Sequence, residues 1–479
     1  MSVVSVRRLR AAKWAWVVAW GCLGTASAAA EELDRAVIGR EVFTRVWRPR
    51  PFGTSGDGLG PMHNDVSCVA CHLQGGVGGG GPAENNVTLL SLSGDARPAK
   101  GRVAPAILHP GFATARTVVL HRFGTTSDYE PWRQTLLDID VPEGLSPERA
   151  EERRAAIQRR LDAHGPVARV RNGVHQLLVS QRNTPALFGA GFIDRISDDD
   201  IRRLAAEQSL RRGGVSGRVA PVAPAGLDPV VAEAMTPAAA AGLGQAAAEF
   251  FKRTGREGVG RFGWRGQIET LEDFVLSACA NELGLQTPHH DQPGDPIDPW
   301  PNAGEDMTAE EREALITFVA DLPTPRQIAP EETDEAVAVY AGRESFDAVG
   351  CADCHVADVG PAFGIYSDLL LHDMGPRLSD PAPAAPSTAL VPTGVVTYFG
   401  PASALVTVDS NLRQEWRTPP LWGVRDSAPY LHDGRAATIT EAIAWHGGES
   451  AASVKRFARL TAEEQSHLLA FLNTLAAPE

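Results

Sequence analysis

The sequence predicts a mostly α-helical protein made of two similar units that derive from an internal duplication. Three observations support this fold class. Short motifs recur in the same order in both halves, two late segments have the signature of capped amphipathic helices, and strand-like alternation of apolar residues is scarce. With 479 residues, the chain is also long enough for two domains with insertions. We expect a first unit over residues 31–322, a linker over 323–332 and a second unit over 333–479.

The chain opens with a segment typical of a secretory leader. Four basic side chains precede a short apolar run, Trp14 to Leu23, and the small residues Ala26 to Ala30 follow it. The apolar run is too short to span a bilayer. We therefore expect residues 1–30 to be a signal peptide that is cleaved on export to the periplasm, and no stable membrane insertion of the mature protein.

The balance of charge argues against nucleic acid as a partner. The formal net charge is -14, and loss of residues 1–30 removes four basic side chains and no acidic one, which makes it -18. Binding to phosphate backbones needs the opposite sign. An acidic surface instead suits a basic or mixed-charge redox protein.

The most specific pattern is a Cys-x-x-Cys-His unit that occurs twice. In an exported protein, two thiols at this spacing can add to the vinyl groups of one haem while the adjacent His faces the iron. Zinc would need four ligands gathered at one point, and neither a redox thiol pair nor a disulfide accounts for the His. The sequence thus predicts two covalently bound haems, attached at Cys68, Cys71, Cys351 and Cys354, with His72 and His355 as iron ligands.

Four pairs of segments recur in the same order around these motifs, which predicts two cytochrome c-like domains. The pairs are Gly39–Phe43 with Gly342–Phe346, Thr184–Gly189 with Thr418–Gly423, Thr270–Leu271 with Thr438–Ile439, and Thr308–Glu311 with Thr461–Glu464. In the last pair, Thr followed three residues later by Glu is a capping box that starts a helix. Long loop insertions are expected in the first unit at 75–102, 219–240 and 286–305, with another loop at 375–400 in the second.

The sixth ligand decides whether a haem carries electrons or reacts with a small oxidant. In the second unit, the helix that starts after Thr438 places His446 on an apolar face. We expect His446 to ligate the second haem. The alternative is a histidine that only caps the helix C-terminus.

In the first unit, the same register puts Ala278 in the place of His446, and alanine cannot bind iron. Glu282 lies one turn further along that face, where an acid is costly unless it is paired or used. We expect Glu282 to be catalytic at an open first haem; the alternative is an outward-facing acid or a structural salt bridge. The other candidate ligands of this haem are Met62, His63, His109, His121, His175 and Cys279.

The register also aligns Trp264 with His432, each just before its helix. A tryptophan between two haems can relay electrons. Burial as a core aromatic is the alternative.

These residues resemble a family, the bacterial di-haem oxidoreductases related to di-haem cytochrome c peroxidase and to MauG. The resemblance extends from Gly39 to Leu475. Its most specific segments are Asp57–Pro61, Gly260–Trp264, Tyr366–Gly375, Glu415–Gly423 and Tyr430–Arg435.

The resemblance implies roles for individual residues. His446 stands where the peroxidases have a Met ligand and MauG a Tyr, which implies a bis-His haem of lower potential. Trp264 corresponds to the tryptophan between the haems, and Glu282 lies near the distal catalytic Glu. An inter-domain calcium ion would be held partly by the backbone carbonyls of Ser427 and Pro429. The Gly-rich stretch after His72 has no match for the loop histidine of resting peroxidases.

The resulting functional hypothesis is reduction of hydrogen peroxide, or a related oxidant, at the first haem. Glu282 would move a proton, and electrons would come from the second haem by way of Trp264 and from a donor such as cytochrome c or a cupredoxin. Two alternatives remain. One is MauG-like oxidation of a protein or organic substrate, and the other is a pure electron-transfer cytochrome with both irons six-coordinate.

Overall fold

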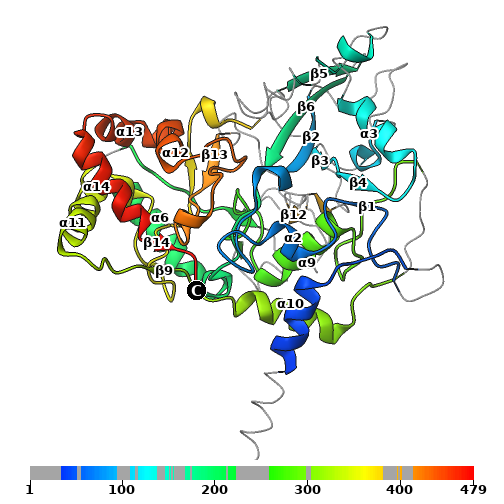
Figure 1. The fold of residues 1–479 in the computed structure, drawn as a ribbon, viewed down its shortest axis with the longest axis horizontal. Coiled ribbons are helices and arrows are strands. Elements are labelled where there is room, and N and C mark those ends of the chain that lie inside the picture. Colours follow the sequence, from blue (N-terminus) through cyan, green and yellow to red (C-terminus); the bar gives the residue numbers. More distant parts are fainter. Residues whose placement is uncertain are drawn as a thin grey trace, which may run out of the picture.

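The computed structural model shows two helical units side by side, with a small β-sheet on the first (Figure 1). Among the described residues, no helix has the length and apolar character needed to cross a membrane. The expected signal peptide lies outside the described residues. These are 34–50, 56–93, 108–113, 117–137, 146–149, 151–152, 155, 168–172, 175–211, 214–222, 258–297, 304–380, 396–397, 400–401 and 414–478.

The first unit is formed by helices around a buried apolar core. Its helices include residues 34–44, α2 (Cys68–Cys71), α3 (Tyr129–Leu137), α5 (Ala190–Asp194), α6 (Asp198–Leu210), α9 (Leu271–Leu283) and α10 (Ala309–Ala320). The core cluster also contains residues of the second unit, among them Ile365, Leu370 and Trp422. The two units therefore share one core instead of meeting only at their surfaces.

The second unit is built on the pairing of its first and last long helices (Figure 1). It contains α11 (Thr333–Ala348), α12 (Ile439–Trp445), α13 (Ala451–Phe457) and α14 (Ala462–Asn473). Phe346 of α11 packs against Phe471 of α14 with ring centroids 5.4 Å apart. Gly342 permits the close approach, because a Cβ there would lie 1.9 Å from the carbonyl oxygen of His467.

Capping residues define the helix starts as the sequence predicts. Thr308, Thr438 and Thr461 each begin a helix with a complete capping box, which satisfies amide groups that have no partner within the helix. Thr270 caps α9 by accepting a hydrogen bond from the amide of Asp273. The predicted helices that follow these residues are confirmed.

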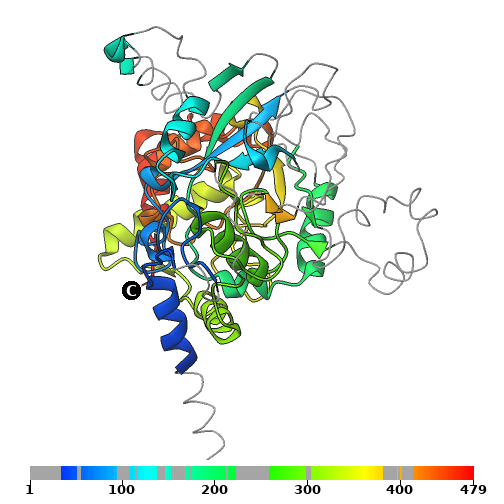
Figure 2. The same ribbon diagram turned by 90° about the vertical axis from the view of Figure 1, so that its right-hand side faces the viewer.

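A four-stranded antiparallel sheet, in the order β3-β2-β6-β5, corrects the expectation of a loop over residues 75–102. Its strands are β2 (Val87–Ser93), β3 (Thr117–Val119), β5 (Ala168–Asn172) and β6 (His175–Arg182). Strand β2 lies inside the expected loop and pairs along its whole length with β6. Leu90, Leu177 and Val179 are buried on the sheet together with Phe112 from the segment between β2 and β3. Figure 2 shows this sheet above the helical part of the first unit.

Five short strand pairs complete the described structure; all but the β11–β12 hairpin join segments that are distant in sequence. The pairs are β1 (Met62–His63) with β4 (Phe123–Gly124), β7 (Pro221–Val222) with β8 (Gly258–Val259), β10 (Leu371–Asp373) with β13 (Glu415–Arg417), β11 (Val396–Thr397) with β12 (Gly400–Pro401), and β9 (Arg326–Gln327) with β14 (Leu475–Ala476). Since β9 lies within 323–332, the expected linker is paired with the last strand of the second unit.

The short 3-10 helices are Ala83–Asn85, Pro110–Ala113, Cys351–Asp353, Pro376–Leu378, Val424–Asp426 and Gly448–Ser450.

Candidate functional site

Two neighbouring cavities contain the two Cys-x-x-Cys-His motifs. The N-terminal cavity, of about 130 Å³, is lined by Cys68, Cys71 and His72. The C-terminal cavity, of about 300 Å³, is lined by Cys351, Cys354 and His355. Both cavities share wall residues, namely Thr184, Pro185, Leu187, Gly263, Trp264 and Phe274. The motifs therefore lie in adjacent cavities with a common wall.

Each motif histidine is held in the tautomer that a metal ligand needs. The Nδ1 atom of His72 lies 3.1 Å from the carbonyl oxygen of Gly79, and that of His355 lies 2.8 Å from the carbonyl oxygen of Tyr366. A carbonyl can only accept, so Nδ1 carries the proton and Nε2 keeps its lone pair. Burial lowers the pKa of both histidines to about 4, so both imidazoles are neutral at pH 7.

The motif cysteines are unpaired thiols, which removes the disulfide alternative. Burial raises the pKa of Cys68 and of Cys351 to about 12, so both are protonated at neutral pH. Protonated thiols beside a neutral imidazole on an apolar cavity wall fit covalent haem attachment at each motif.

One group of side chains in the described part of the chain has metal-ligand spacing, but its hydrogen bonds argue against a metal. Cys354, Asp368 and His372 bring ligand atoms within 4.8 Å of one another. Both nitrogens of His372 are engaged, Nε2 with Asp368 and Nδ1 with Glu449, each at 2.9 Å. Burial alone would lower the pKa of His372, but these partners and Cys354 outweigh it and raise the pKa to about 12. An imidazolium has no lone pair for a metal.

His446 lies on the wall of the C-terminal cavity together with His355. It is the C-cap residue of α12, and its Nδ1 lies 2.7 Å from the carbonyl oxygen of Ala442. That contact again leaves Nε2 with its lone pair. Burial lowers the pKa of His446, which favours the neutral form. His446 is therefore the C-cap residue of α12 and also lies where an iron ligand is expected.

Glu282 lies on the wall of the N-terminal cavity, as do Ala278 and Cys279 from the preceding turn of α9. The side chain of Asn64 donates a hydrogen bond of 2.6 Å to its Oε2. Burial raises the pKa of Glu282 to about 7, against the opposing effect of this hydrogen bond. Among the described residues, none forms a salt bridge with Glu282, and the salt-bridge alternative finds no support.

Most of the rival ligands of the first haem are absent from the N-terminal cavity. The Nε2 atom of His121 lies 2.8 Å from the carbonyl oxygen of Asn281, and His109 packs against Trp132 with ring centroids 5.6 Å apart. His63 contacts the carbonyl oxygen of Gly60 at 3.3 Å through Nδ1. Met62 is also absent from the wall, and the side chain of His175 lies outside the described residues. Of these rivals, Cys279 alone lines the cavity among the described side chains.

Trp264 lines both cavities and is anchored to both units. Its indole nitrogen donates to the carbonyl oxygen of Asn183 at 2.9 Å, and its own carbonyl accepts from the amide of Arg417 at 3.0 Å. In a matching contact, the amide of Asn183 donates to the carbonyl oxygen of His432 at 2.8 Å. The carbonyl of Trp264 thus accepts a hydrogen bond from the second unit, and the carbonyl of His432 accepts one from the first unit.

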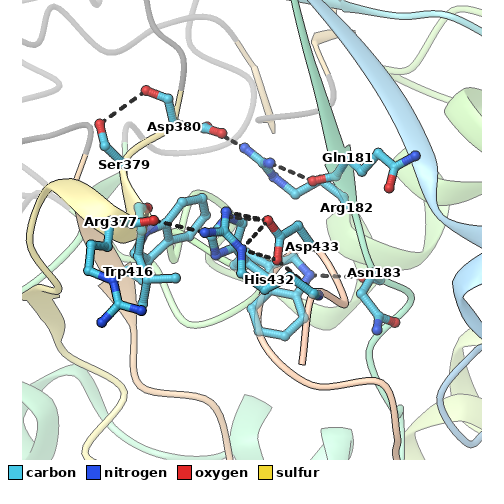
Figure 3. Close-up of polar contacts among 12 residues, drawn as sticks. Gln181, Arg182, Asn183, Arg377, Ser379, Asp380, Trp416, His432 and Asp433 are labelled. Atoms are coloured by element: carbon cyan, nitrogen blue, oxygen red, sulfur yellow. Dashed lines mark hydrogen bonds and ion pairs between the residues drawn. The ribbon is translucent and has the colours of Figure 1, made fainter. Parts of the chain in front are cut away.

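The structure reveals an aromatic stack that the sequence does not predict. Trp416 and His432 lie parallel, with ring centroids 3.6 Å apart and an interplanar angle of 10° (Figure 3). Arg182 lies 5.1 Å from the centre of the Trp416 ring and forms an ion pair with Asp380, which Figure 3 also shows. Spacing along the chain gives no signal for these contacts, because Trp416 and His432 belong to no common local motif and Arg182 comes from the other unit.

Of the two carbonyl groups expected to hold calcium, that of Pro429 already accepts a hydrogen bond. The carbonyl oxygen of Pro429 accepts from the side-chain amide of Asn183 at 2.7 Å. Asn86 and Asn183 both approach Gly434, where a Cβ would lie 3.3 Å and 3.1 Å from their amide nitrogens. The hydroxyl of Ser427 donates to the carbonyl oxygen of Gly423 at 2.7 Å. The geometry therefore gathers amide groups around Pro429.

Comparison with known proteins gives one family match. Residues 406–475 match the family described as "Di-haem oxidoreductase, putative peroxidase". No curated protein matches the chain.

Two solved structures are also similar to parts of the chain. Hydrazine synthase from Kuenenia stuttgartiensis is 23% identical over 36% of this chain and 57% of its own, with a TM-score of 0.24. The chain thus spans little more than half of that protein. A MauG-like protein associated with microbial copper homeostasis is 23% identical over 45% of this chain and 69% of its own, with a TM-score of 0.27.

Proposed function

We propose that the protein is an exported di-haem c-type oxidoreductase that reduces hydrogen peroxide at its N-terminal haem; the match of residues 406–475 to the di-haem oxidoreductase family supports this proposal. The observation that carries this proposal is the unequal lining of the two cavities. The described wall of the N-terminal cavity has a single histidine, His72, and two acids, Asp65 and Glu282. The C-terminal cavity has three histidines besides its motif histidine, namely His372, His432 and His446. Carboxylates engage both nitrogens of His372, and His432 stacks on Trp416, which leaves His446 as the best candidate for a second ligand.

The chain supplies the groups that position two haems. Bound haem provides the redox chemistry, and the protein fixes its ligands and surroundings. His72 and His355 present Nε2 as neutral ligands, since each Nδ1 is held by a backbone carbonyl. His446 presents Nε2 in the same way and is the proposed sixth ligand of the C-terminal haem. A bis-His site of this kind suits electron transfer.

Glu282 is the proposed general acid and base. With a pKa near 7 it is about half protonated at neutral pH, which is the condition for efficient proton transfer in both directions. The hydrogen bond from Asn64 holds Oε2 and leaves Oε1 for the substrate. The carboxyl group can accept a proton from one peroxide oxygen and donate it to the other.

Trp264 is the proposed route for electrons between the haems. It lines both cavities, and contacts with both units fix its position. Electrons would enter from a small donor such as a cytochrome c or a cupredoxin. The acidic net charge of -14 favours a basic donor. Calcium near Ser427 and Pro429 remains part of the proposal, because the side-chain amide of Asn183 lies beside the Pro429 carbonyl and both groups carry oxygen atoms of the type that binds calcium.

Electron paramagnetic resonance of the oxidised protein, with and without peroxide, tests the proposal. We expect one high-spin ferric signal that disappears on addition of peroxide and one low-spin bis-His signal. Peroxide consumption with reduced cytochrome c as donor should accompany the change. Two low-spin signals that do not respond to peroxide would support a pure electron carrier instead.

The same preparation distinguishes peroxide reduction from the alternative, MauG-like oxidation. The peroxide-treated protein would then oxidise a protein or organic substrate faster than it oxidises reduced cytochrome c. Peroxide turnover that depends on the cytochrome donor is the result that the proposed function requires.

A further inference from the structure

Arg417 is a buried cation on the wall of the C-terminal cavity. It ends strand β13 and is 8% exposed. Its Nε donates to the carbonyl oxygen of Gly263 at 2.8 Å, and a terminal nitrogen donates to that of Thr418 at 3.4 Å. Both acceptors are neutral. No ion pair joins Arg417 to any residue in the described part of the chain.

The other buried arginines of the described residues all have a carboxylate partner. Arg182 pairs with Asp380, and Arg261 pairs with Asp198. Burying a guanidinium without an anion is costly, because water no longer solvates the charge. Burial lowers the pKa of Arg417 to about 10, so the group is still charged at pH 7. The carboxylate of Asp368 is near enough to oppose this lowering, but its Oδ2 is hydrogen-bonded to Gln208 and His372 and it forms no ion pair with Arg417. Arg417 therefore has room for an anionic partner on the side that faces the cavity.

We propose that Arg417 binds a propionate carboxylate of the haem attached at Cys351 and Cys354. This inference rests on the proposed di-haem function. The planar guanidinium matches a carboxylate with two parallel hydrogen bonds, and the propionates are the anionic groups of haem. Arg417 lines the cavity that contains His355 and does not line the N-terminal cavity, which assigns it to the C-terminal haem.

The contact has an electrochemical consequence. A fixed positive charge at the haem edge favours the reduced form, which carries one more electron. Arg417 would therefore raise the potential of a haem that two histidine ligands would otherwise hold low. The backbone amide of Arg417 also donates to Trp264, so the same residue connects the haem edge to the proposed electron route.

Spectroelectrochemical titration of the full-length holoprotein tests the inference. In Arg417→Gln, we expect the reduction equilibrium of the C-terminal haem to shift at least tenfold toward the oxidised form, about 59 mV for a one-electron couple. The potential of the N-terminal haem should change much less. In resonance Raman spectra, the propionate bending band of the C-terminal haem should move to lower frequency.

Two further variants make the result specific. Arg417→Lys keeps the charge but not the paired donors, so it should restore most of the potential while the propionate band stays shifted. Arg203→Gln removes an exposed positive charge on α6 and should leave both readings unchanged.

The outcomes separate this inference from the proposed function. An unchanged potential and band in Arg417→Gln, with haem still attached at Cys351 and Cys354, would overturn the inference and leave the function standing. A shift confined to the N-terminal haem would overturn the assignment to the C-terminal haem. Should Arg417→Gln fail to fold, an unshifted propionate band in Arg417→Lys overturns the inference. Absence of haem at the second motif in the wild-type protein would overturn both.

Discussion

Burial raises the pKa of Glu282 to about 7, so this carboxyl group gains or loses a proton near neutral pH. As a general base it must be deprotonated, so kcat/KM for peroxide should rise with pH up to about 7 and level off above it. Glu282→Gln should lower kcat/KM by about 100-fold or more and abolish this pH dependence. Stopped-flow measurement with intact haem absorbance checks both results.

A matched control lies on the same helix. Glu272 is exposed in the first turn of α9, and Glu272→Gln should leave the pH profile unchanged. Glu282 would be excluded from the mechanism if Glu282→Gln kept the wild-type rate.

His446 provides the second prediction at this scale. His446→Met should convert the C-terminal haem from bis-His to His/Met ligation and raise its potential, because a thioether favours the reduced iron. The low-spin resonance spectrum of that haem should change accordingly. His289→Asn, at an exposed position, serves as the control. An unaltered spectrum in His446→Met would mean that another residue binds the iron.

At the scale of elements, helix α6 of the first unit is hydrogen-bonded to the second Cys-x-x-Cys-His motif, Cys351–His355, and to the segment that follows it. Gln208 of α6 donates to the side chain of Asp368 at 2.7 Å and to the carbonyl oxygen of Asp353 at 3.0 Å. Asp368 in turn binds His372, whose other nitrogen contacts Glu449. A buried network of this kind is stable only when all its members are paired.

Asp368→Asn should therefore destabilise the protein by about 3 kcal/mol, because it removes one partner of a buried charge. The raised pKa of His372 adds a dependence on pH. Its stabilising contribution is complete below pH 6.5, the ordinary pKa of histidine, and declines as the pH rises toward 12. Urea unfolding at pH 6 and pH 9 measures both effects. Equal stability of the variant and the wild type at pH 6 would contradict the prediction.

Elements differ in how far the sequence predicts them. The helices after Thr308, Thr438 and Thr461 are predictable because their capping boxes are local. Strand β2 is not, because its partner β6 lies about 90 residues later and Gly-rich sequence precedes it.

The same limit applies within the candidate site. Cys68–His72 and Cys351–His355 are recognisable from spacing alone. The stack of Trp416 on His432 and the unpaired charge of Arg417 depend on tertiary packing, and no local pattern encodes either of them.

At the scale of the whole molecule, the two units share one apolar core. Leu369, Leu370 and Trp422 of the second unit belong to the core cluster that otherwise consists mainly of first-unit residues. Residues 333–479 expressed alone would expose these side chains to water. We expect that fragment to aggregate or to be digested much faster than the full chain in limited proteolysis. Equal protease resistance would show that the second unit folds independently.

The last strand also touches the loop that follows the first motif. A Cβ at Gly75 would lie 2.6 Å from that of Ala477, and Ala477 adjoins β14, which pairs with β9. A larger side chain at either position would push the His72 loop away from the C-terminal strand. Size changes at the tail of the polypeptide can therefore move His72, in the opposite half of the chain, by purely steric means.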